Sequence, residues 1–82
     1  MPGPSSVPRP ELVALGQAVR RHREARSWTP AALAEQAGVS RRTIGNIESG
    51  AYSSGIGAVL DVAHALGIRL TDLVSEAGID PD

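Results

Sequence analysis

The chain has 82 residues and contains no cysteine, and these two facts limit its function. The length is that of one small domain. Disulfides and thiolate metal sites are excluded, and no carboxylates accompany both histidines, His22 and His64, so a histidine metal site is not expected. The N-terminus lacks the apolar segment of a signal peptide, and no apolar run approaches the roughly 18 residues of a membrane helix. The composition predicts a cytoplasmic protein without metal or other cofactors.

The net charge of −1 conceals an uneven distribution along the chain. Residues 1–46 carry seven arginines and three glutamates, a net charge of +4, whereas residues 47–82 carry one arginine and six acidic residues, a net charge of −5. Such asymmetry favours a polyanionic partner for the basic half, although a solvated charged surface would give the same counts. All eight cations are arginines, whose planar guanidinium suits phosphate and guanine better than the lysine ammonium does.

Taken in chain order, the sequence predicts an all-α fold of five short helices without strand alternation. Residues 1–9 are rich in proline, glycine and serine, which predicts a flexible tail, with a minor-groove DNA contact by Arg9 as the alternative. A first helix is expected to run from about Pro10, where the missing N–H costs nothing, to Arg26. The residues of its inward face are Leu12, Leu15, Val19 and Arg23.

The second and third helices have clear start and stop signals. Thr29 followed by Pro30 is a typical N-cap and first helical position, and Gly38 ends the second helix. Ser40 is expected to cap the third helix, and Gly50 to end it. The inward residues are Leu33, Ala34 and Ala37 on the second helix, and Ile44, Ile47 and Glu48 on the third.

Two more helices are expected after a loop at residues 52–55, in which Ser53 and Ser54 are candidate caps. The fourth is expected to pack through Ile56, Val59, Leu60, Ala63 and Leu66 and to stop at Gly67. The fifth carries Leu70, Leu73 and Val74 and ends near Gly78, so the folded domain spans 10–78 and residues 79–82 are expected to fray. A chain this small has a thin core, which favours a homodimer through helices four and five with Ile68, Leu70 and Val74 at the contact.

The connection between the second and third helices carries the functional signal. In Ala37-Gly38-Val39-Ser40 the glycine reverses the chain, the valine fills the corner and the serine caps the next helix. This pattern is typical of a helix-turn-helix, in which the second helix of the pair enters the major groove of DNA. The outward positions of that helix, with Ile44 and Glu48 pointing inward, are Arg42, Asn46 and Ser49.

The segments LAEQAGVSRRTIGNIESG at 33–50 and VAHALGI at 62–68 resemble the lambda-repressor-like helix-turn-helix family, of the Cro/cI or XRE type, over about residues 15–73. The resemblance implies a sequence-specific transcriptional regulator that binds double-stranded DNA, and a homodimer on a pseudo-palindromic operator. It also implies an ion pair between Arg23 and Glu48. The implied base-contacting residues are Arg41, Arg42, Gly45 and Asn46, and the implied phosphate contacts are Thr29, Ser49, Tyr52, Ser53 and Ser54.

Side-chain chemistry agrees with these roles, since arginine suits guanine O6 and N7 and asparagine suits adenine N6 and N7. The chain departs from the family at three places. Pro30 replaces the usual phosphate-binding glutamine, and the loop at 51–54 has no basic residue. Gly45 costs the third helix about 1 kcal/mol relative to alanine and removes one side chain from the base-contacting face.

Other functions remain as alternatives. An antitoxin of a toxin–antitoxin pair would bind both DNA and a protein partner, and a protein-interaction module on the same scaffold would bind only protein. No spacing of Ser, His and Asp suggests a catalytic triad, so an enzyme is not expected. Trp28 is interpreted as a core residue rather than a base-stacking one, and His64 as partly exposed. Arg20, Arg21 and His22 are interpreted as a solvated face, with a weak phosphate contact as the alternative for His22.

Overall fold

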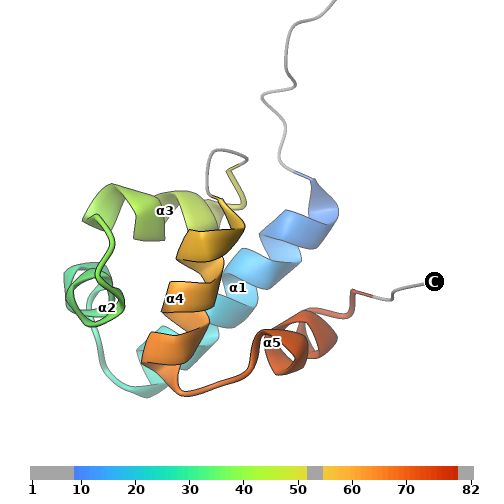
Figure 1. Ribbon diagram of the computed structural model, residues 1–82. Helices are drawn as coiled ribbons and strands as arrows, with labels where there is room; N and C mark the ends of the chain where they lie inside the picture. Colours follow the sequence, from blue (N-terminus) through green and yellow to red (C-terminus); the bar gives the residue numbers. More distant parts are fainter. Residues whose placement is uncertain (1–8, 52–54, 80–82) are drawn as a thin grey trace, which may run out of the picture.

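The computed structural model describes residues 9–51 and 55–79, which form five α-helices (Figure 1). Within those residues there is no strand, so the predicted all-α architecture is confirmed. Most of the predicted tail, as well as Tyr52, Ser53 and Ser54, lies outside the described residues. The helices are α1 (Pro10–Ala25), α2 (Pro30–Ala37), α3 (Arg41–Ser49), α4 (Ile56–Leu66) and α5 (Leu70–Glu76).

The starts of α2 and α3 follow from local capping, as the sequence predicts. The Thr29 Oγ1 accepts a hydrogen bond from the Ala32 N–H at 3.1 Å, which caps α2. Likewise, the Ser40 Oγ accepts one from the Thr43 N–H at 3.0 Å and caps α3. Between these helices Gly38 adopts a left-handed conformation with φ 72°, which side chains with a Cβ disfavour. The sharp turn at 38–40 therefore has the backbone that the sequence pattern requires.

The core joins α1, α3 and α4 to the smaller α2 and α5. Its fully buried large side chains come from all five helices, so every helix contributes to the core. Arg23 is the buried charged residue in the described part of the chain, with 8% of its surface exposed. The six largest fully buried residues are Val19, Leu33, Ile44, Val62, Leu66 and Leu73.

The predicted inward face of α4 is partly wrong. Ile56 and Leu60 are exposed, at 67% and 48% of their surface, whereas Val62 is fully buried. The reason is that α4 must pack on α2, α1 and α5 together, which selects the face of Val59, Val62, Ala63 and Leu66. The N-cap residue of α4 is Gly55, and the candidate caps Ser53 and Ser54 lie outside the described residues.

Both ends of the described chain are more tightly held than the sequence suggests. Arg9, assigned to the flexible tail, is the N-cap of α1, and its carbonyl oxygen accepts the Val13 N–H at 3.0 Å. Ile79, expected to fray, donates its N–H to the Val74 carbonyl at 3.2 Å and packs on the core. The apolar side chain of Ile79 packs against the core. The sequence alone does not indicate this contact, because charged residues follow Ile79 directly.

Candidate nucleic-acid interface

Helix α3 is held at the outer edge of the molecule by two buried isoleucines. Ile44 and Ile47 are 0% and 5% exposed and pack in the core shared with α1 and α2. Figure 1 shows α3 lying across one end of the bundle, next to the end-on α2. Because the inward face is fixed by these residues, the opposite face is presented to solvent. This is the arrangement that a recognition helix requires.

The predicted base-contacting residues share that solvent-facing side of α3. Arg41 and Arg42 are exposed in its first turn, and among the described residues neither forms an ion pair. Asn46 is half-buried, one turn after Arg42. Gly45 is exposed, and a Cβ built on it would have no atom within 4 Å. The site therefore offers two unneutralised guanidinium groups and an amide beside an open stretch of helix backbone.

The structure describes two of the predicted phosphate-contacting hydroxyls, Thr29 at the start of α2 and Ser49 at the end of α3. Thr29 is exposed, and its hydroxyl accepts the capping bond from Ala32, which leaves its hydrogen free to donate to an anion. Ser49 is exposed, but its Oγ donates to the Asn46 carbonyl at 3.1 Å, so that bond would have to break before the hydroxyl could donate to a phosphate. The other three nominated residues, Tyr52, Ser53 and Ser54, lie outside the described part of the chain.

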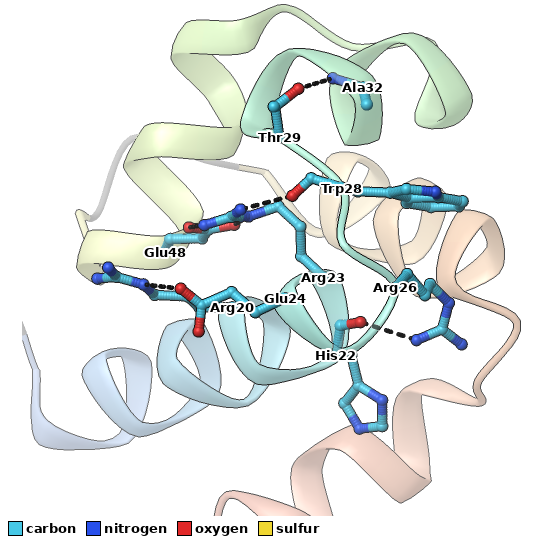
Figure 2. A network of polar contacts seen from close by, with 9 residues as sticks. All are labelled: Arg20, His22, Arg23, Glu24, Arg26, Trp28, Thr29, Ala32 and Glu48. Carbon is cyan, nitrogen blue, oxygen red and sulfur yellow. Dashed lines mark hydrogen bonds and ion pairs between the residues drawn. The ribbon is translucent and has the colours of Figure 1, made fainter.

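A buried ion pair connects α1 to α3 (Figure 2). The Arg23 Nε and Nη2 donate to the two carboxylate oxygens of Glu48 at 2.6 and 3.0 Å, and the two side chains are 9% and 12% exposed. The Arg23 Nη1 also donates to the Trp28 carbonyl at 2.8 Å. The hydrogen bond to Glu48 raises the pKa of Arg23 above its ordinary value, against the effect of burial. The guanidinium therefore fixes both α3 and the segment that leads into α2.

Gly16 is a structural residue of the site that the sequence interpretation missed. A Cβ on Gly16 would lie 2.2 Å from the Ile47 carbonyl oxygen and 2.7 Å from that of Glu48, so α1 and α3 cross with their backbones in contact. The available signal was a glycine inside an amphipathic helix, where it costs about 1 kcal/mol relative to alanine. A glycine at such a cost indicates that another backbone approaches α1 closely at this position, but it does not indicate which element that is.

The arginine- and histidine-rich part of α1 is not simply a solvated face, which corrects the sequence interpretation. The His22 Nε2 lies 2.6 Å from a carboxylate oxygen of Glu76 in α5, and the Arg21 Nη2 lies 3.3 Å from the other oxygen. The hydrogen bond to His22 lowers the pKa of Glu76 below its ordinary value of 4.5. Arg20 instead pairs with Glu24 on the same helix at 3.2 Å.

Arg26 and Trp28 lie in the connection between α1 and α2 and contact each other there. The Arg26 guanidinium donates to the His22 carbonyl at 2.9 Å, the contact marked by a dashed line in Figure 2. It also donates to the Leu66 carbonyl, and it lies 6.0 Å from the centre of the Trp28 ring. Trp28 is partly buried against the core, which agrees with its interpretation as a packing residue. His64 is exposed.

The outer face of α5 carries an apolar groove of about 420 Å³. It is lined by Leu70, Thr71, Val74, Ser75 and Ile79. In the described residues, no helix is long and apolar enough to cross a membrane, and no three metal-ligating side chains gather.

Comparison with known proteins identifies similar chains. The family model described as a helix-turn-helix domain matches residues 14–78. The immunity repressor protein of Bacillus phage phi105 is 36% identical over 62 residues, which cover 76% of this chain. The chain spans 43% of the length of that repressor.

Two solved structures share the fold at a similar level of identity. The restriction-modification controller protein C.AhdI from Aeromonas hydrophila superposes with a TM-score of 0.73 at 31% identity, covering 79% of this chain and 98% of that one. The clp gene regulator ClgR from Corynebacterium glutamicum superposes with a TM-score of 0.77 at 30% identity, covering 90% of this chain and 95% of that one. All three relatives are regulators by name.

Proposed function

Because the chain belongs to the lambda-repressor-like helix-turn-helix family of DNA-binding transcriptional regulators, we propose that it binds a specific pseudo-palindromic operator. In this proposal α3 lies in the major groove and α2 lies across the DNA backbone. The proposed base contacts are Arg41, Arg42, Gly45 and Asn46, and the proposed phosphate contacts are Thr29, Ser49, Tyr52, Ser53 and Ser54.

The observation that carries the proposal is the outward face of α3. Arg42 and Asn46 are one turn apart on a helix held from behind by Ile44, Ile47 and the buried pair of Glu48 with Arg23. A rigidly held helix can place both side chains against base edges of one groove. The matching preferences are guanine for the arginine and adenine for the asparagine. We therefore expect each half-site to contain a G·C pair close to an A·T pair.

Selection of bound sequences from a random duplex pool tests the proposal. We expect one enriched half-site, repeated with two-fold symmetry at a spacing of about one helical turn. The variant Arg42→Ala then distinguishes two roles of Arg42, a contact with a guanine base and a contact with a backbone phosphate. Loss of a bidentate guanine contact should remove about 1–3 kcal/mol of discrimination at one G·C pair in each half-site. A uniform loss over all sequences would make Arg42 a phosphate contact and transfer the base-contacting role to Arg41.

Failure of the selection also has a definite meaning. A domain that binds no duplex in a salt-sensitive manner would overturn DNA recognition and favour the protein-interaction alternative. Enrichment of one sequence together with a tightly co-purifying protein would instead favour the antitoxin alternative.

The proposal includes a homodimer through α4 and α5. Two apolar surfaces support it: the exposed pair Ile56 and Leu60 on α4, and the groove on α5 that contains Leu70 and Val74. Exposed apolar side chains of this size, one turn apart, are typical of an interaction surface when they form a contiguous patch. A two-fold axis at these helices would place two copies of α3 about 34 Å apart, one turn of DNA.

A further inference from the structure

Arg9 occupies a position that the local structure of α1 does not explain. It is the N-cap residue of that helix, it is exposed, and its side chain makes no capping hydrogen bond. Arginine is not a favoured N-cap residue, because it has no short side-chain acceptor for the free N–H groups. Its positive charge also lies at the positive end of the helix dipole, which is mildly unfavourable. Neither capping nor the helix dipole therefore accounts for an arginine at this position.

The N-terminal part of α1 lies beside the C-terminal end of the recognition helix. A Cβ on Gly50, the residue that ends α3, would lie 2.9 Å from the Val13 Cα. Leu12 also shares a small cleft with Gly50 and Ala51. Arg9 precedes Leu12 and Val13 by three and four residues, so it lies on the same side of α1. Arg9 therefore lies about one helical turn from Val13, the residue of α1 that contacts the end of α3.

The charges along α3 are concentrated at its other end. Arg41 and Arg42 are in its first turn, whereas residues 43–55, which complete the helix and follow it, contain no lysine or arginine. A helix in the major groove has a DNA backbone near each of its ends, and each backbone carries phosphates that favour a cation. The sequence of α3 supplies no cation at its C-terminal end, and Arg9 is the arginine of the chain that is nearest in sequence to Val13, where α1 contacts that end.

We propose that Arg9 contacts a backbone phosphate of the operator beside the C-terminal end of α3. This inference rests on the proposed function, because it requires α3 to lie in the major groove. The contact would be made by the guanidinium to a phosphodiester oxyanion, and it would add affinity without selecting a base. It would also fix the angle at which α3 enters the groove, since α1 and α3 are in direct backbone contact at Gly16.

The test compares two arginines in matched positions. Arg69 is also an N-cap residue without a capping side-chain bond, but it belongs to α5, where its exposed side chain pairs with Asp72 at 3.3 Å. The affinity for the selected operator is measured for Arg9→Ala, Arg9→Lys and Arg69→Ala over a series of salt concentrations. Circular dichroism checks that each variant is folded.

We expect Arg9→Ala to lower the slope of log K against log salt by about one unit and to weaken all sequences alike. Arg9→Lys should restore the slope, because a phosphate accepts a point charge, and Arg69→Ala should leave it unchanged. An unchanged slope in Arg9→Ala, or a loss confined to one base pair, would overturn the inference. If the unmodified chain binds no duplex, the proposed function fails; if it binds while Arg9→Ala behaves identically, only this inference fails.

Discussion

The Arg23 guanidinium is surrounded by acceptors that each fix one part of the fold. Two of its nitrogens bind Glu48 near the C-terminal end of α3 and a third binds the Trp28 carbonyl that precedes α2, so a single side chain links α1 to the end of α3 and to the start of α2. The desolvation of two charges opposes this pair, so its net contribution to stability is smaller than its geometry suggests. Its value lies in the position of α3, which the binding of bases requires.

The first prediction concerns this pair. Arg23→Ala leaves the Glu48 carboxylate buried without its partner, and we expect the free energy of unfolding to fall by about 3–5 kcal/mol. Chemical denaturation measures the loss. Arg21→Ala is the control, because it removes an exposed arginine of the same helix whose side chain is 55% exposed. An equally small effect of both substitutions would show that the pair is not structural.

The same variants distinguish two roles of Arg23, the positioning of α3 and a direct contact with DNA. If Arg23 only positions α3, the operator affinity of Arg23→Ala should fall in proportion to the fraction of unfolded chain. A further loss in the fully folded protein at low temperature would instead indicate a direct contact with DNA.

At the scale of helices, α1 and α3 are joined more closely than any hydrophobic pattern implies. Gly16 lets the two backbones touch, and Gly50 allows a second close approach at Val13. The contact line between the helices therefore contains two glycines, and the apolar residues Leu15 and Ile47 pack beside it. Enlarging either glycine would force α3 away from α1 and change the orientation of the recognition face.

A second prediction uses the same substitution at two helical glycines. Gly16→Ala places a Cβ against backbone oxygens that cannot move cheaply, so we expect a loss of about 1–3 kcal/mol in the free energy of unfolding. Gly45→Ala meets open space in α3 and should instead stabilise the fold by about 1 kcal/mol. Thermal unfolding of both variants checks the opposite signs. Equal shifts of the melting temperature would contradict the close crossing.

Gly45→Ala also reports on the proposed base contacts. Since in the described part of the chain no other element lies within 4 Å of a Cβ at this position, any loss of operator affinity in this more stable variant would come from contact with DNA. Unchanged or tighter binding would remove Gly45 from the proposed interface.

A third prediction concerns the contact between α1 and α5. The pKa of Glu76 is lowered by its hydrogen bond to His22, so the ionised carboxylate is favoured in the folded state. This contribution to stability is present above the unfolded-state pKa and is lost as the pH falls through the lower folded-state pKa, below about 4.5. Glu76→Gln should therefore lower stability at neutral pH and have little effect in that acidic range.

The measurement is a series of denaturation curves from neutral pH down to about pH 3. The expected effect is small, because the Glu76 side chain is 37% exposed and solvent screens the pair. Asp61→Asn, which removes an exposed carboxylate of α4 outside the ion pairs of the described residues, is the control. A constant difference between Glu76→Gln and the unmodified chain at all pH values would contradict the linkage.

For the whole molecule, the distribution of charge and of exposed apolar surface divides the domain into two functional ends. Among the described residues, the arginines Arg41 and Arg42 of α3 form no ion pair, whereas the apolar groove and two acidic residues, Asp72 and Glu76, lie on α5, which packs against α1 and α4. An acidic end is repelled by DNA, and an apolar groove is suited to a protein contact. The net charge near zero therefore does not argue against DNA binding, because the charges are spatially separated.

The fourth prediction tests the proposed homodimer. Ile56→Glu and Leu60→Glu on α4, and Thr71→Glu in the α5 groove, each introduce a charge at an exposed position without enlarging the core. We expect sedimentation velocity to show two chains for the unmodified protein and one chain for at least one of these variants. Gln36→Glu on the exposed face of α2 is the control and should leave the mass unchanged. A monomeric unmodified protein, both free at high concentration and on DNA, would contradict the prediction.

The sequence by itself determined the features that depend on neighbouring residues. The starts of α2 and α3 at Thr29-Pro30 and Ser40, and the turn at Gly38, follow from hydrogen bonds and backbone conformations within three or four residues. The helix-turn-helix is therefore evident from one continuous segment. The Arg23–Glu48 pair was expected only through the family resemblance, and the structure confirms it.

Only the tertiary structure decided which faces of the helices meet. The exposure of Ile56 and Leu60, the contact of Gly16 with the backbone of α3 and the contact of His22 with Glu76, 54 residues away, depend on the relative positions of whole helices. Local propensity does not contain this information, because an amphipathic pattern gives the direction of an apolar face but not the helix that covers it. The packing of all five helices around one small core selects those partners, and with them the orientation of α3.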